Sequence, residues 1–136
     1  MSYALSLTQP TSVRRGRSAV IALGVVQIAL AGMFLLAGGS KLVGAPAMVT
    51  LFNTIGVGQW FRYVTGLIEV GSAIALLVPS VAVFGALVLV PTMIGAVATE
   101  FFIVGDSAIP PAVLLLGTVA VVWVRRHQIV RHRSAD

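Results

Sequence analysis

The sequence predicts an all-α fold: a four-helix transmembrane bundle with a short amphipathic segment between its first and second helices. Two observations favour this class. Hydrophobic residues make up 58% of the 136 residues and charged residues only 10%, whereas an average soluble domain has about 25% charged residues. The charges also leave uncharged stretches of about 20 residues, the length that spans a bilayer. This composition excludes an ordinary soluble domain and a disordered chain.

The net charge of +5 is concentrated at the two ends of the chain. Seven of the nine Lys and Arg residues lie there: Arg14, Arg15, Arg17, Arg125, Arg126, Arg131 and Arg133. Basic residues that flank apolar blocks are typical of membrane topology signals and of contact with anionic lipid headgroups, so we expect a bilayer and no nucleic-acid partner. The chain has no Cys, which excludes disulfides, Cys-ligated metals and thiol chemistry of its own.

The first predicted helix covers residues 18–40, which are uncharged and lie between Arg17 and Lys41. Residues 29–31 (Ala-Leu-Ala) mimic the cleavage site of a secretory signal peptide. The apolar run, however, continues past them through Leu36, which is too long for the apolar region of a signal peptide. A retained helix is therefore favoured.

The next stretch, residues 41–60, is poor in charge but contains glycines, Pro46 and polar side chains that do not suit a membrane span. Within it, four apolar residues share one helical face: Met48, Leu51, Phe52 and Ile55. This pattern predicts a short amphipathic segment, placed at the membrane interface or as a partly re-entrant loop.

Three further helices complete the predicted bundle. The second covers residues 61–78 and opens with aromatic residues that suit a membrane interface. A Pro-Ser turn separates it from the third, residues 81–104, where Pro91 removes one backbone hydrogen bond and predicts a kink. The fourth covers residues 109–124 and follows a Gly-Asp-Ser turn whose polar side chains can cap its first turn.

Four spans place both chain ends on the same side of the membrane. The basic residues divide seven to two between the two sides, and an excess of basic residues favours the cytoplasm. We therefore expect a multi-pass protein of the cell membrane with both termini cytoplasmic. Its parts would be a basic N-terminus at residues 1–17, a membrane domain at residues 18–124 and a basic tail at residues 125–136.

Glu69 lies about two turns into the second predicted helix, where an unpaired carboxylate would be costly. Arg62 lies on nearly the same face, and Gly66 between them leaves room for the arginine to reach the carboxylate. Lys41, at the same membrane side, is the other candidate partner. The residues form either a polar site for a small polar or quinone-like ligand, or a structural ion pair between the first two helices. Glu100 either joins this cluster or is interfacial and solvated.

Other polar side chains predict no further site. Gln27, in the middle of the first helix, is expected to form a hydrogen bond to another helix. His127 and His132 lie in the basic tail without nearby carboxylates, so no metal site is expected there. The bundle itself contains no histidine, which excludes bis-histidine haem ligation within the membrane.

Residues 35–80 resemble the DoxX-like family of small integral membrane proteins. The resemblance is carried by the Gly-Gly-Ser end of the first helix followed by Lys41, the Pro46 segment, the aromatic-arginine run Trp60 to Tyr63, and Gly66-x-x-Glu69. A Met93-x-x-Ala96 pattern and the basic tail after Trp123 extend it over about residues 20–126. The resemblance implies a four-helix membrane protein and carries over Lys41, Arg62 and Glu69 as the site positions. Many relatives have a histidine where this chain has Glu100.

Some members of that family are associated with thiosulfate:quinone oxidation, or with a membrane complex of superoxide-detoxifying and sulfurtransferase enzymes. The resemblance therefore implies a membrane subunit of a redox or quinone-linked system, with a partner oxidoreductase subunit. The alternative is a non-catalytic membrane anchor or a chaperone-like interaction protein, and a homo-oligomer fits both. Because the chain has no Cys and no internal histidine, a partner enzyme or a bound quinone would have to supply redox chemistry.

Overall fold

The computed structural model describes the backbone of residues 10–133 and the side chains of residues 16–126. This part of the chain is helical and contains no strand. Its elements in chain order are α1 (Pro10–Leu42), α2 (Pro46–Ile55), α3 (Gln59–Leu77), α4 (Ala82–Thr99), the π-helical turn η1 (Glu100–Val104) and α5 (Ile109–Arg133). Four stretches are long and apolar enough to cross a membrane, which confirms the predicted fold class: Gly16–Leu42, Gln59–Leu77, Ala82–Val104 and Ile109–Arg126.

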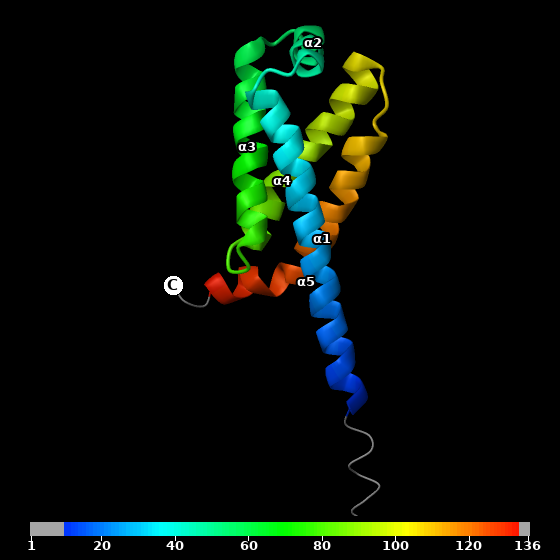
Figure 1. The fold of residues 1–136 in the computed structure, drawn as a ribbon, viewed down its shortest axis with the longest axis vertical. Coiled ribbons are helices and arrows are strands. Elements are labelled where there is room, and N and C mark those ends of the chain that lie inside the picture. The colour runs from blue at the N-terminus through cyan, green and yellow to red at the C-terminus, as the bar shows by residue number, and fades with distance from the viewer. Residues whose placement is uncertain (1–9, 134–136) are drawn as a thin grey trace, which may run out of the picture.

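The four long helices run up and down, so that the bundle has two distinct ends (Figure 1). The start of α1, the turn between α3 and α4, and the end of α5 lie at one end, here named the lower end. Helix α2 and the connection from η1 to α5 lie at the opposite, upper end. The two ends of the described chain therefore lie at the same end of the bundle, as an even number of spans requires.

Two helices are longer than their predicted spans. Helix α1 begins at Pro10 rather than at residue 18, and α5 continues to Arg133 rather than ending near residue 124. The predicted spans ended at charged residues because charges leave the hydrocarbon core, but arginine is a good helix former and lets the helix continue. The last part of α5 crosses the lower end of the bundle (Figure 1).

The predicted amphipathic segment is the helix α2. It begins with Pro46, whose fixed backbone angle suits the first turn of a helix, and it ends at Gly56. Gly56 adopts the left-handed conformation, with φ 82°, and its N–H donates to the carbonyl of Phe52 at 3.2 Å. Glycine is favoured there because a side chain would strain this conformation.

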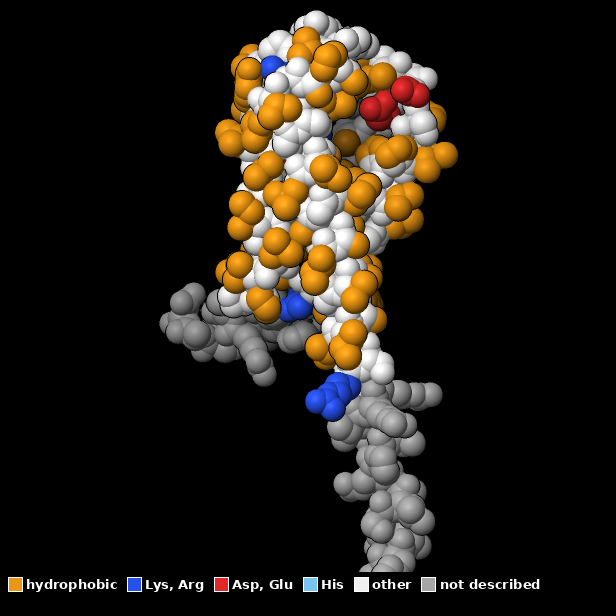
Figure 2. All heavy atoms as spheres, in the orientation of Figure 1, with side chains coloured by type: hydrophobic (Ala, Val, Ile, Leu, Met, Phe, Trp, Pro, Cys, Tyr) orange, Lys and Arg blue, Asp and Glu red, His pale blue; other side chains and the backbone are white. Residues whose placement is uncertain are grey.

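Small residues allow the helices to approach closely, as is usual in membranes. A Cβ atom at Gly38 of α1 would lie only 2.9 Å from the carbonyl oxygen of Gly66 in α3. Likewise, a Cβ atom at Gly85 of α4 would lie 2.8 Å from the carbonyl oxygen of Ser72. Large apolar side chains cover much of the outer surface, as expected for contact with lipid (Figure 2).

Helix α4 continues through Pro91 and passes directly into η1, which the sequence did not predict. In this turn the N–H of Gly105 donates to the carbonyl of Glu100 at 2.8 Å, one residue further along the chain than in an α-helix. Beyond the turn, the hydroxyl of Ser107 accepts a hydrogen bond from the N–H of Ile109 at 3.3 Å, so the predicted polar cap of α5 is present.

Candidate ligand-binding site

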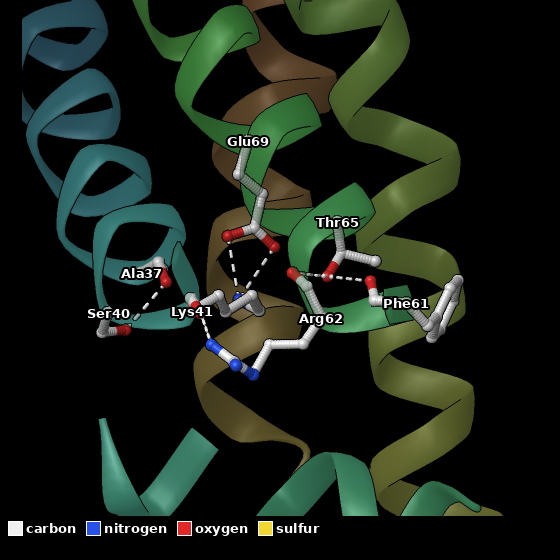
Figure 3. Close-up of polar contacts among 7 residues, drawn as sticks. All are labelled: Ala37, Ser40, Lys41, Phe61, Arg62, Thr65 and Glu69. Atoms are coloured by element: carbon white, nitrogen blue, oxygen red, sulfur yellow. Dashed lines mark hydrogen bonds and ion pairs between the residues drawn. The ribbon is translucent and has the colours of Figure 1, made fainter. Parts of the chain in front are cut away.

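Lys41 and Glu69 form an ion pair that joins α1 to α3 (Figure 3). The ammonium nitrogen Nζ of Lys41 lies 3.0 Å from Oε1 and 2.9 Å from Oε2 of Glu69. The side chain of Glu69 is 4% exposed and that of Lys41 is 14% exposed. The sequence left two partners open for the carboxylate, and the structure assigns Lys41.

Arg62 does not reach Glu69, contrary to the prediction that Gly66 would leave room for it. Its Nη1 donates instead to the carbonyl oxygen of Lys41 (Figure 3). Its Nε donates to Oε1 of Gln59 at 2.7 Å. The space beside Gly66 is filled by α1, since a Cβ atom there would meet the carbonyl of Gly38 at 3.0 Å. Arg62 therefore turns to the C-terminal carbonyls of α1, which carry partial negative charge.

Gln59 extends this network to α2, and the sequence analysis did not identify it. Its amide Nε2 donates to the carbonyl of Val49 at 3.0 Å and to Oδ1 of Asn53 at 2.8 Å. Together with Arg62, it ties α2 to the ends of α1 and α3. In the sequence, the polar residues within the otherwise apolar stretch of residues 41–60 could have indicated this network.

A cavity of about 580 Å³ lies at the upper end, within the range of small-molecule sites. Its walls come from α1, α2, α3, α4, η1 and α5 and are mainly apolar. The predicted apolar face of α2 lines it: Met48, Leu51, Phe52 and Ile55. The ion-paired side chains of Lys41 and Glu69 also lie on its wall, so the cavity combines an apolar interior with a charged group.

Glu100, at the start of η1, lines the same cavity and is half-buried. Figure 2 shows acidic side chains beside a hollow at the upper end. Among the described residues, the structure records no hydrogen bond between Glu100 and the Lys41–Glu69 pair. Three of the four predicted site residues therefore share one cavity, and Arg62 lies outside it, behind Lys41.

The ion pair leaves donor capacity on Lys41. An ammonium group carries one more N–H than its two contacts with Glu69 use, and no other described side chain or carbonyl accepts it. A polar ligand atom in the cavity can therefore accept a charge-assisted hydrogen bond from Lys41. Among the described residues, no group of three or more His, Cys, Asp or Glu side chains is arranged to hold a metal ion.

The fold and the composition of its surface define a multi-pass α-helical membrane protein with a ligand-sized cavity at one end. The profile of the DoxX-like family matches residues 25–124, which is most of the chain, and the chain therefore belongs to that family. No curated protein matches the chain significantly, and neither does any solved structure.

Proposed function

We propose that the protein is a membrane subunit of a quinone-linked redox system and that its upper cavity binds a quinone-like ligand. The observation that carries the proposal is the placement of the Lys41–Glu69 pair on the wall of a mainly apolar cavity. An apolar wall suits a lipophilic ring and its tail, and a few placed polar groups orient a ligand in such a site.

The donor set fits a quinone. A quinone ring presents carbonyl oxygens, which accept hydrogen bonds but donate none, and Lys41 has an N–H that Glu69 does not use. Glu69 holds the ammonium in place, and Arg62 fixes the backbone of Lys41 through its carbonyl. Lys41 is thus the residue that would bind the ligand, while Glu69 and Arg62 position it.

A bound quinone would supply the two-electron carrier chemistry that this chain lacks. The chain has no Cys, so the electrons would come from a partner oxidoreductase subunit docked on the membrane domain. The chain itself would provide a water-poor site, a hydrogen bond to the ring oxygen, and carboxylates at Glu69 and Glu100 on the cavity wall.

Binding of a short-chain ubiquinone to the purified protein in lipid nanodiscs tests the proposal. We expect saturable binding, and Lys41→Met should raise Kd about tenfold, the effect of losing one charge-assisted hydrogen bond. Leu51→Trp should block binding by filling the cavity without touching the ion pair. Asp106→Asn is the matched control, because Asp106 is an exposed acidic residue at the same end that does not line the cavity.

Wild-type protein that binds no quinone, or a Leu51→Trp variant that binds it as well as wild type, would contradict the proposal. Absence of quinone binding together with stable recovery of a protein partner would instead support the non-catalytic anchor. Thermal unfolding of each variant, measured in parallel, separates lost binding from lost folding.

A further inference from the structure

A second polar cluster lies at the lower end, around Gln27 and Arg125. Gln27 is 4% exposed, and its Nε2 donates to the carbonyl of Leu76 at 3.0 Å. Its Oε1 accepts from Nε of Arg125 at 2.8 Å, and Nη1 of Arg125 donates to the carbonyl of Pro79 at 3.3 Å. These contacts join α1, the turn between α3 and α4, and α5, and they hold the guanidinium in a fixed orientation.

Within the part of the chain that the structure describes, the groups that hold Arg125 are neutral. Its two recorded acceptors are an amide oxygen and a carbonyl oxygen, and the structure gives its remaining N–H groups no acceptor among the described residues. The ion pair found among the described side chains is the one between Lys41 and Glu69, which lies at the upper end and does not involve Arg125. Arg125 is half-buried, so its positive charge is held between the helices, and no carboxylate among the described residues balances it.

The surroundings of Arg125 are those of a membrane surface. Arg126 lies over the ring of Trp123, 4.3 Å from its centre, and Trp123 is 66% exposed. The apolar side chain of Val124 is also exposed. Figure 2 shows basic side chains at the lower end of this face, whereas the acidic side chains lie at the upper end, where a basic side chain is also visible. Aromatic and basic side chains at the end of an apolar span are typical of the headgroup region.

We propose that Arg125 forms the centre of a binding site for the phosphate group of an anionic phospholipid. A guanidinium presents its N–H groups in a planar fork that matches phosphate oxygens, and basic pockets between transmembrane helices bind anionic headgroups in this way. A lipid rather than a soluble anion fits the place, because Arg125 lies at the end of an apolar span whose exposed side chains would contact the acyl chains. The proposal does not depend on the function of the upper cavity.

Native mass spectrometry of the full-length protein in detergent, titrated with phosphatidylglycerol or phosphatidylcholine, tests this site. We expect phosphatidylglycerol to be retained and phosphatidylcholine to be lost. Arg125→Lys keeps the charge but loses the planar fork, and it should weaken retention about tenfold. Arg126→Gln is the matched control, because it removes a charge from the adjacent position, where the arginine stacks on Trp123, and it should change retention by less than about twofold.

Gln27→Leu provides an independent variant, because it leaves every charge in place and removes the amide that orients Arg125, together with the hydrogen bond of that amide to the carbonyl of Leu76. It should also weaken retention of phosphatidylglycerol. Equal effects of Arg125→Lys and Arg126→Gln would indicate diffuse attraction to a basic surface and overturn the site. Competition by millimolar inorganic phosphate would show a soluble-anion site instead. Equal retention of the two lipids by the wild type would overturn the proposal without reference to any variant.

Discussion

The two ends of the bundle use buried polar side chains in different ways. At the upper end, Lys41 and Glu69 carry opposite charges and face a cavity. At the lower end, the amide of Gln27 and two backbone carbonyls form hydrogen bonds, and no carboxylate among residues 16–126 pairs with Arg125. Both arrangements join helices that are distant in sequence.

The two arrangements differ in how much they stabilise the packing of the helices. Neutral hydrogen bonds and close glycine contacts assemble helices at little electrostatic cost, since no charge has to be removed from water. A buried ion pair is a weaker device for stability, because desolvation offsets much of its attraction. The placement of the ion pair beside a cavity therefore favours a role in binding, and the hydrogen bond from Gln27 to the carbonyl of Leu76 at the lower end favours a role in assembly.

Removal of the carboxylate should have the largest effect on stability. Glu69→Ala leaves Lys41 buried without its partner, and breaking a buried pair typically lowers the free energy of unfolding by about 3–5 kcal/mol, less where water reaches the cavity. Glu69→Gln retains the shape and a hydrogen bond and should be milder. Unfolding in detergent measures both. Wild-type stability in both variants would refute the ion pair as a structural contact.

At the lower end of the bundle, Gly85→Ala should lower the free energy of unfolding by an intermediate amount. Its Cβ atom would lie 2.8 Å from the carbonyl of Ser72, so α3 and α4 would have to separate, at a cost of about 1–3 kcal/mol. Gly71→Ala is the matched control, because nothing lies within 4 Å of its Cβ position. That variant should be neutral or up to about 1 kcal/mol more stable, since alanine favours helix. Equal destabilisation of the two variants would show that close approach is not the cause.

The side of the membrane that each end of the bundle faces can be determined without a variant that changes stability. From the distribution of Lys and Arg, we predict that the lower end faces the cytoplasm and the cavity opens toward the opposite side. Reporter fusions after Ser80 and after Asp136 should both report the cytoplasm. A non-cytoplasmic signal from either fusion would reverse the orientation or change the number of spans.

Much of the architecture could be predicted because lipid imposes strict local rules. Spans of uncharged residues and the apolar face of α2 are visible in the sequence, and the structure confirms both. The sequence named Lys41 and Arg62 as candidate partners of Glu69 because few charges lie near it, but only the structure selects Lys41. The predicted helix ends were wrong in α1 and α5, where the helix continues through charged residues at the lower end.

The details that could not be predicted depend on contacts between distant segments. The position of Arg62 is decided by α1, which fills the space beside Gly66, and no local pattern reveals that packing. The bond between Gln27 and Arg125 joins residues 98 positions apart. Gln27 was expected to form a hydrogen bond between helices, and it does so with Leu76, but its second partner lay in a segment interpreted only as a basic tail.

The π-helical turn η1 contains one residue more than an α-helical turn would need, and this gives the chain a place to vary in length. Loss of a single residue from Phe101–Val104 would restore α-helical bonding and keep the span continuous. The same deletion would rotate the helical residues that follow it by about 100° relative to α4, because one residue of an α-helix corresponds to that rotation. A relative that is one residue shorter here would therefore keep the same four spans and the same position of Glu100, but its chain would enter the connection to α5 in a different direction.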